Sequence, residues 1–295
     1  MRKIIAYILY IIYLPKIIKE SKRCDSLLTI YGHDISLNSF ENLIKWLLKK
    51  DYYFISCYEL FDYINGNLSD KKKYVWLSFD DGWKSNYNNV FPILKKYNIP
   101  ATIFVATKGI EDGYFWFNKA RYNRNSIFYK DIKELWEMPN QNRVEIIEKL
   151  EMKKDYRLTM NPDELKEITS SGLICWGNHT NDHVMSDKCK EDELKNEIFL
   201  CNEKIKQWTG KDSNFIYSYP NGNFDGNSER IVREMGFKMA TTTEMDRTFK
   251  NTNPFSIPRT EFKEVSLKEN ILHIYNIWTP FFDKLKRTFN IQSKK

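Results

Sequence analysis

The sequence predicts an α/β protein built on a parallel β-sheet. From residue 27 onwards, short apolar runs alternate with segments whose apolar residues recur at helical spacing, which is the pattern of β-α units. The 295 residues are 42% hydrophobic, so the chain is able to bury one large core. An α/β barrel and an open, doubly wound sheet both fit this alternation, and periodicity does not choose between them.

The predicted strands are short, and helices separate them. The first helix has apolar residues from Phe40 to Leu48 at i, i+3, i+4, i+7 and i+8, so one stripe faces a core. Another helix is predicted to begin at residues 161–164, where Asn is followed by Pro in the first turn. The predicted strands cover residues 27–31, 53–56, 74–79, 101–106, 173–176, 215–219 and 238–241, with a weaker candidate at 255–258.

Three segments fall outside this alternation. Residues 108–160 are rich in charged and aromatic side chains, and we interpret them as a partly helical insertion able to wall or cover a site. Residues 1–23 form an apolar and basic N-terminal segment, and residues 271–295 form a basic, aromatic C-terminal helix. The sequence between them, residues 24–270, is predicted to form one domain.

The basic side chains gather at the two ends. The net charge is +7, but residues 1–23 hold six basic side chains against one acid, and residues 284–295 hold five and none. The chain between them therefore carries a net negative charge. Because no basic groove is indicated, we expect no nucleic-acid partner.

The apolar segment 4–14 lies behind Arg2 and Lys3, like the start of a secretory signal, but no small-x-small cleavage site follows. It is too short to span a bilayer. We interpret it as a helix in the membrane interface, and the C-terminal helix has similar character. The alternative is that both are ordinary helices that cap the core.

The cysteines indicate a reducing compartment. There are five, an odd number, and no two are arranged as Cys-x-x-Cys. We therefore expect a cytoplasmic protein, located at the inner face of the membrane, with an extracytoplasmic location as the alternative.

Two clusters of metal-ligating residues follow predicted strands. His179 and His183 are four residues apart, which puts both imidazoles on one side of a helical turn. Asp80 and Asp81 precede Gly82, which permits the turn needed to bring both carboxylates to one site. A metal would hold one carboxylate and leave the other as a base. The alternative for the acidic pair is a solvent-exposed turn.

A third cluster, Tyr219-Pro220-Asn221-Gly222, also follows an apolar run. Its tight turn is able to direct a backbone N–H into a pocket, although a plain β-α loop has the same composition. The three clusters follow three different strands. Active sites of parallel α/β folds lie at this carboxyl face, so we expect the clusters to meet there.

The motifs resemble those of the polysaccharide deacetylases, the NodB-homology enzymes of carbohydrate esterase family 4. The matching residues are Phe79-Asp80-Asp81-Gly82, His179-Thr180-x-x-His183 and Tyr219-Pro220-x-Gly222, with further similarity at 85–87, 92–94, 100–105 and 257–259. The resemblance covers residues 27–262 apart from the insertion. It implies a distorted (β/α) barrel that binds zinc or a similar divalent ion.

The resemblance also implies roles for individual residues. Asp80 takes the place of the general base, and the metal ligands are Asp81, His179 and His183. The general acid of the family is a histidine in a hydrophobic-x-His-Asp motif, and His33 in Tyr31-Gly32-His33-Asp34 is the better match. This position resembles the circularly permuted poly-N-acetylglucosamine deacetylases. The alternative is His273, which no Asp follows.

The sequence departs from the family pattern at two places. Ser218 stands where an arginine often orients the catalytic aspartate, and we expect Arg259 to supply the guanidinium instead. Asn221 replaces a usual tyrosine but keeps the backbone N–H that stabilises the oxyanion. Aromatic residues beside the motifs are expected to stack on a sugar, with core packing as the alternative; they are Trp83, Trp176 and Tyr219.

The function implied is that of a metal-dependent hydrolase. It would remove N-acetyl groups from an amino-sugar oligosaccharide, polysaccharide or lipid-linked glycan and release acetate. The alternatives are an O-acetyl esterase, another metal-dependent amidase, a catalytically silent carbohydrate-binding protein and a membrane-associated scaffold. The sequence does not predict the oligomeric state.

Overall fold

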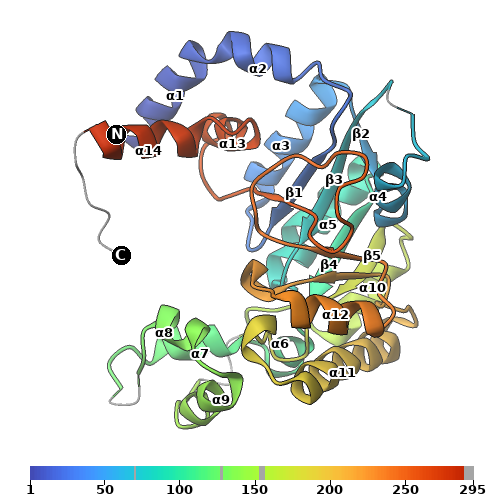
Figure 1. Ribbon diagram of the computed structural model, residues 1–295, viewed down its shortest axis with the longest axis vertical. Helices are drawn as coiled ribbons and strands as arrows, with labels where there is room; N and C mark the ends of the chain where they lie inside the picture. The colour runs from blue at the N-terminus through green and yellow to red at the C-terminus, as the bar shows by residue number, and fades with distance from the viewer. Residues whose placement is uncertain (70, 127–128, 153–156, 289–295) are drawn as a thin grey trace.

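The computed structural model describes residues 1–69, 71–126, 129–152 and 157–288. Its centre is a parallel sheet in the order β7-β6-β5-β4-β3-β1-β8, and β2 also pairs with β3 (Figure 1). The strands are β1 (Leu28–Gly32), β2 (Tyr52–Ile55), β3 (Lys73–Phe79), β4 (Ala101–Val105), β5 (Ile174–Asn178), β6 (Ile216–Ser218), β7 (Met239–Thr241) and β8 (Thr260–Glu261). The α/β class is thus confirmed.

One edge of β3 is shared by two strands. β2 pairs with residues 73–76 of β3, and β4 pairs with Ser78 and Phe79. β1 takes the opposite edge, with its partners running from Leu28–Val75 to Gly32–Phe79. The carboxyl end of β3 therefore lies between β1 and β4.

A short segment joins the two edges of the sheet. Ile257 forms a parallel bridge with Thr241 at the end of β7, and Thr260 and Glu261 pair with β1. Residues 257–261 thereby close the sheet into a distorted barrel, which confirms the barrel expected from the resemblance. The sequence predicted a weaker strand candidate at residues 255–258, whereas the strand in the structure is β8, at residues 260–261.

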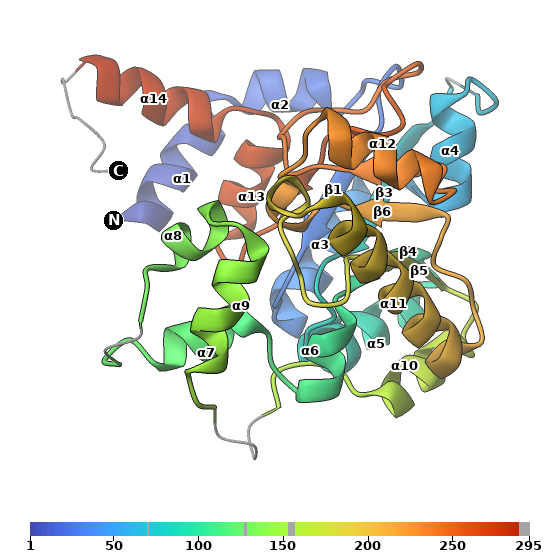
Figure 2. The ribbon, with the colours of Figure 1, turned by 60° about the horizontal axis from the view of Figure 1, so that its bottom comes forward.

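Helices cover the outside of the barrel (Figures 1 and 2). α3 (Leu37–Lys49) begins at Ser36, whose hydroxyl accepts a hydrogen bond from the Ser39 N–H. The other helices after strands are α4 (Cys57–Ile64), η1 (Asn86–Val90, a π-helix), α5 (Phe91–Tyr97), α10 (Pro162–Thr169), η2 (Ser186–Lys188), α11 (Glu191–Thr209), η3 (Pro220–Gly222) and α12 (Gly226–Glu234).

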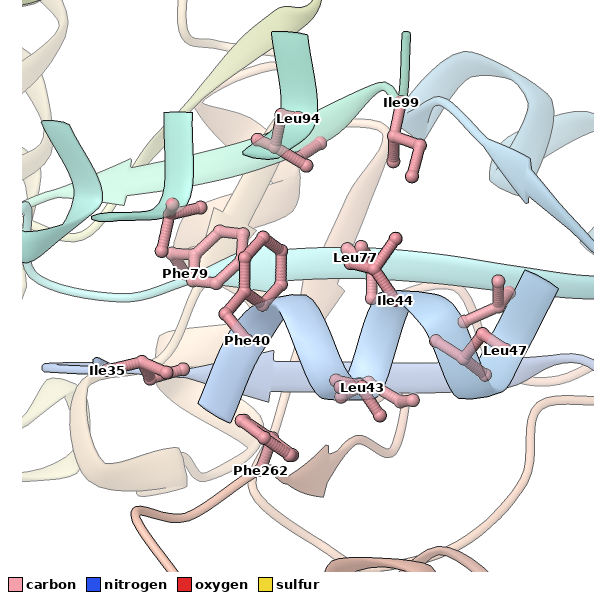
Figure 3. Packing of buried hydrophobic residues seen from close by; sticks show 14 of the residues in the cluster. Ile35, Phe40, Leu43, Ile44, Leu47, Leu77, Phe79, Leu94, Ile99 and Phe262 are labelled. Carbon is pink, nitrogen blue, oxygen red and sulfur yellow. The ribbon is translucent and has the colours of Figure 1, made fainter. Parts of the chain in front are cut away.

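The largest hydrophobic cluster lies between α3, the sheet and α5. Figure 3 shows the predicted apolar stripe of α3, with Phe40 and Ile44 facing Leu77 and Phe79 of β3. The rings of Phe40 and Phe79 meet edge to face at 5.4 Å. Burial of each such side chain contributes about 1.5–3 kcal/mol, so this face fixes α3 on the sheet.

The insertion is helical and has its own small core. Its helices are α6 (Thr107–Asp112), α7 (Trp116–Tyr122), α8 (Ile132–Glu137) and α9 (Asn140–Glu148). The buried residues of this hydrophobic core include Phe115, Trp116, Phe117 and Leu135. Met185, from the loop after β5, packs among them. The cluster therefore holds the insertion against the loop that follows β5.

The terminal helices pack on one another at one side of the barrel (Figure 1). They are α1 (Arg2–Ile12), α2 (Leu14–Glu20), α13 (Leu267–Ile274) and α14 (Trp278–Thr288). The Arg2 guanidinium pairs with the buried carboxylate of Glu269 and joins α1 to α13. Within the described ranges, we find no helix with the length and apolar character needed to cross a bilayer.

Candidate active site

A cavity of about 390 Å³ lies at the carboxyl ends of the strands. It brings together residues from all three motifs, the loop after β1, the closing segment and the insertion. The lining residues are Tyr31, His33, Asp80, Asp81, Trp83, Phe117, Arg121, Trp136, His179, His183, Asn221, Thr243 and Glu261.

Three buried side chains converge in this cavity as a metal-binding group. Oδ1 of Asp81 lies 3.3 Å from Nε2 of both His179 and His183. The three ligand atoms lie within 4.8 Å of one another. Asp81 Oδ1 is buried and has no hydrogen-bond partner among the described residues. One carboxylate oxygen and two imidazole nitrogens form a ligand set that fits a divalent ion such as zinc and leaves an open position.

The local backbone aims these ligands. Asp81 has a φ of 73° and His183 a φ of 48°, both in the left-handed region. The Nδ1 atom of His179 lies 2.8 Å from the Ser218 carbonyl. Donation of its N–H there leaves Nε2 as the metal-facing lone pair. Gly82, with a φ of 93°, completes the turn that the sequence predicted.

The charge states of the group suit metal binding. Burial would raise the pKa of Asp81, but the imidazoles of His179 and His183 outweigh it and hold that pKa well below its usual range. Burial lowers the pKa of His183, so its imidazole stays neutral at neutral pH. An ionised carboxylate and a neutral imidazole are the forms that bind a metal.

Asp80 is held by Arg259 in a bidentate ion pair. Two guanidinium nitrogens lie 2.8 Å from the two carboxylate oxygens, and both side chains are buried. The guanidinium also donates to the hydroxyls of Ser78 and Ser218 and to the Thr242 carbonyl. Ser218, which replaces the usual arginine, is thus a partner of Arg259.

The position of Arg259 follows from the barrel closure. It lies in the segment 257–261, which is tied to β7 on one side and β1 on the other. Burial would raise the pKa of Asp80, but the guanidinium outweighs it and lowers that pKa below its ordinary value. Asp80 is therefore ionised at neutral pH, as a base must be.

His33 enters the cavity from the loop after β1. Its Nδ1 lies 3.5 Å from Oε1 of Glu261, and its ring meets Tyr31 edge to face. Burial lowers the pKa of His33, but Glu261, Asp81 and Asp80 outweigh it and raise the pKa to about 9. The imidazole therefore carries a proton at neutral pH.

A clamp of two asparagines holds the His33 loop. The side chain of Asn86, which is buried, donates to the His33 carbonyl at 3.0 Å. Asn89 donates to the Ile35 carbonyl at 2.9 Å. Both asparagines belong to the π-helix η1, which begins four residues after Gly82 of the Asp80–Asp81 turn.

The second candidate acid, His273, lies outside this cavity. It sits on α13, is 7% exposed and packs against Trp278 at 5.7 Å between ring centroids. It lines a separate surface hollow beside α2. Of the two histidines, the structure thus brings only His33 to Asp80 and Asp81.

Of the remaining predicted site residues, two line the cavity and two are buried in the core. Asn221 lines the cavity with a left-handed φ of 57°, and Trp83 lines it while donating its indole N–H to Asp81 Oδ2 at 2.7 Å. The expectation that Trp176 and Tyr219 contact the sugar is corrected. Trp176 is buried and donates to Thr169 of α10, and Tyr219 is buried with its ring stacked on Phe224.

Several lining residues were not predicted from the sequence. Glu261 follows Arg259 by two residues, and this spacing places two side chains on one face of a strand. The spacing was the sequence feature from which Glu261 could have been predicted. Phe117, Arg121 and Trp136 come from the insertion. Its aromatic composition indicated a wall but did not show which residues form it.

The fold and the site are those of a polysaccharide deacetylase. Residues 67–240 match that family, and the chain belongs to it. The prediction of a metal-dependent enzyme of this family is confirmed.

The chain is similar to poly-β-1,6-N-acetyl-D-glucosamine N-deacetylases. It is 27% identical to that of Staphylococcus aureus over 262 residues, which cover 86% of this chain and 75% of the relative. It is 33% identical to that of Staphylococcus epidermidis over 108 residues, or 37% of this chain and 35% of the relative.

Solved structures share the fold. IcaB from Ammonifex degensii superposes with a TM-score of 0.62 and 21% identity, covering 85% of this chain and 97% of that one. The Streptococcus pyogenes deacetylase PplD, solved with acetate, has a TM-score of 0.62 and 19% identity, covering the same shares of the two chains.

Proposed function

We propose that this enzyme removes N-acetyl groups from a β-1,6-linked N-acetylglucosamine polymer or a closely similar glycan. The observation that carries the chemistry is the meeting of Asp80, His33 and the three ligand residues in one cavity. The staphylococcal relatives, whose names specify this polymer, support the choice of substrate.

Asp81, His179 and His183 would hold the metal, and zinc is the ion we propose because two imidazoles and one carboxylate suit it. A divalent ion bound there would supply Lewis-acid polarisation of the acetyl group. The protein's own contribution to that step is a buried set of three ligands, in which the pKa of Asp81 and the pKa of His183 are both lowered.

Asp80 and His33 are proposed to move the protons. The Asp80 carboxylate, oriented by Arg259, accepts a proton from the attacking water. His33, held by Glu261, gives its proton to the amine nitrogen as the C–N bond breaks. The backbone N–H of Asn221 is proposed to donate to the oxyanion.

The protonated state of His33 favours an amide over an ester. An amine leaves only when its nitrogen receives a proton, whereas the alkoxide of an ester is a better leaving group. A histidine whose pKa is raised to about 9 is protonated over the whole neutral range. N-deacetylation is therefore the reaction that this site is best suited to catalyse.

Aromatic residues of the cavity wall are proposed to bind the sugar. Trp83 and Phe117 lie beside the ligand group, with their ring centroids 6.2 Å apart. Trp136 of α8 adds a partly exposed indole from the insertion. Such rings provide flat apolar faces for the C–H side of a pyranose.

We propose the cytoplasm as the compartment, with the enzyme at the inner face of the membrane. All five cysteines are free thiols, which supports a reducing environment. Recovery of most of the protein from an extracytoplasmic fraction would overturn this location in favour of the alternative.

The function is tested by acetate release from β-1,6-N-acetylglucosamine oligosaccharides. We expect release that a chelator abolishes and that added zinc restores. Asp80→Asn and His33→Gln should abolish it, and His273→Gln is the matched histidine control that should retain it. O-acetylated oligosaccharides in the same assay test the esterase alternative.

Two results would contradict the proposal. Faster release from the O-acetylated substrate would identify an esterase. Tight oligosaccharide binding by the zinc-loaded protein without any acetate release would identify a carbohydrate-binding protein.

A further inference from the structure

Helix α1 has apolar residues on two opposite sides. Ala6 and Leu9 are buried where α1 packs against α13. On the other side, a single stripe of isoleucines is 49–64% exposed: Ile4, Ile8, Ile11 and Ile12. A helix that packs on a protein with one side normally presents polar residues to water on the other, so the isoleucine stripe lacks an explanation within the fold.

Cations lie on the same helices as the stripe. Lys3 of α1 and Lys16 and Lys19 of α2 are exposed. Lys268 of α13 lines one groove with Lys3, and its Nζ is 5.1 Å from the ring centroid of Tyr7. Glu20, which is the single acid among residues 1–23, is paired with Arg23. The surface is therefore both apolar and positively charged.

A groove of about 390 Å³ runs beside α1, and its walls are largely apolar. Lys3 and Lys268 stand in this groove together with Tyr7, Tyr10 and Trp46. Tyrosine and tryptophan are the side chains enriched at the headgroup level of membranes, and lysines pair there with lipid phosphates.

We propose that α1 docks on an anionic lipid bilayer and lies in its interface. The docking surface consists of the four isoleucines together with Lys3, Lys16, Lys19 and Lys268, and we call it the α1 surface. The isoleucines enter the acyl boundary and the lysines contact the phosphates. Eleven residues span roughly 16 Å, so the helix lies along the interface rather than across the bilayer.

A second copy of the chain fits the α1 surface less well than a bilayer does. In a symmetric dimer the same patch meets itself, which gathers the lysines of both copies around one contact. An anionic membrane satisfies the apolar stripe and the cations at once. Figures 1 and 2 place α1 and the insertion helices α7–α9 on the same side of the molecule.

The proposal is tested by co-sedimentation of the full chain with vesicles. One set is pure phosphatidylcholine, and the other contains about one third phosphatidylglycerol. We expect binding to the anionic set to be at least ~10-fold tighter. Ile8→Gln/Ile12→Gln should weaken that binding at least ~10-fold, and Lys16→Gln/Lys19→Gln should weaken it and reduce its salt dependence.

Phe199→Gln on α11 is the matched control, because Phe199 is also about half exposed but lies outside the α1 surface. It should bind vesicles like the unaltered protein. All of these variants should keep the same acetate release from soluble oligosaccharide, so a failure of docking is distinguished from a failure of the proposed function.

Equal vesicle binding by Ile8→Gln/Ile12→Gln and the unaltered protein would overturn the proposal. So would an absence of vesicle binding together with a dimer, seen by light scattering, that the same double variant converts to monomers. That second result would assign the α1 surface to self-association.

Discussion

The carboxylate of Asp80 and the guanidinium of Arg259 are both shielded from solvent, so each charge depends on the other. Removing one partner of such a pair leaves an uncompensated buried charge, which costs more than the pair itself contributes. Arg259 also joins the ends of three strands, because its partners Ser78, Ser218 and Thr242 lie at β3, β6 and just beyond β7. One side chain therefore supports both the base and the barrel closure.

Arg259→Met is expected to lower stability and activity together. The buried Asp80 would lose its counter-charge, its pKa would rise, and the free energy of unfolding would fall by about 3–5 kcal/mol. Urea unfolding measures the loss of stability. The acidic limb of the pH profile of kcat reports the pKa of Asp80 and should move to higher pH.

Arg259→Lys is the matched variant for this prediction. It retains the positive charge but loses the bidentate geometry, so the acidic limb should stay closer to that of the unaltered enzyme while kcat falls. An acidic limb at the same pH in Arg259→Met and in the unaltered enzyme would show that Asp80 does not depend on Arg259.

Glu261 raises the proton affinity of His33 from the neighbouring strand β8. Its own pKa is lowered to about 2, because burial is outweighed by hydrogen bonds to His33 and Lys263. It is thus a carboxylate throughout the neutral range and stabilises the imidazolium. The pKa of His33 is raised in the folded protein, so this stabilisation is fully present below pH ~6.5 and is lost as the pH rises through about 9.

Glu261→Gln is expected to move the alkaline limb of the kcat profile to lower pH by about one unit, because the imidazolium loses its carboxylate partner. The loss of folding stability should be larger at pH 6 than at pH 10, since His33 is charged only at the lower value. Lys263→Gln tests the specificity of the effect and should shift the limb much less. A limb that does not move in Glu261→Gln would separate His33 from the proton transfer.

At the scale of single elements, the insertion changes the active site without supplying any motif residue. α7 and α8 carry Phe117, Arg121 and Trp136 to the cavity, and the insertion's own core includes Phe117 and packs against Trp136. The indole of Trp136 is partly exposed in the cavity wall, so part of its ring is available to contact a sugar.

Trp136→Ala is expected to raise KM about tenfold and to change kcat by less than twofold, because the indole binds the sugar but moves no proton. Steady-state acetate release over a range of oligosaccharide concentrations measures both constants. Tyr122→Ala is the control, since Tyr122 is exposed on α7 and lies outside the cavity lining. A fall in kcat at unchanged KM would place Trp136 in the chemical step instead.

The elements also show which parts of the site could be predicted from sequence. Each motif directly follows a strand, and parallel strands bring their carboxyl ends together, so the meeting of Asp80, Asp81, His179 and His183 follows from local patterns. Proximity to a motif does not fix the direction of a side chain. Trp176 is close to the histidine motif in sequence, yet it faces Thr169 of α10 on the outside of the barrel.

At the scale of the whole molecule, closure of the barrel could not be predicted from periodicity. It depends on the two residues of β8 and on one bridge between Ile257 and Thr241. Segments this short have no measurable alternation. The contact between His33 and Glu261 requires that closure, because β8 pairs with β1. The pairing of His33 with Glu261 is therefore determined by tertiary structure and not by local sequence patterns.

The metal ligands link distant parts of the chain, so metal binding should stabilise the whole fold. Asp81 follows β3 and the two histidines follow β5, and all three must be in place to bind an ion. A ligand that binds only the folded state stabilises it by about 2.7 kcal/mol at a hundredfold excess over its Kd. Zinc added to chelator-treated protein should therefore raise the unfolding midpoint by roughly 5 °C.

The ligand variants and the pH dependence make this last prediction specific. His179→Ala should abolish the zinc-induced shift, whereas His273→Ala, which removes a histidine outside the cavity, should retain it. Zinc binds only to deprotonated ligands, so the shift should be present at pH 7 and should shrink as the pH falls. An equal shift in His179→Ala and in the unaltered protein would place the zinc at another site, and differential scanning calorimetry distinguishes the two outcomes.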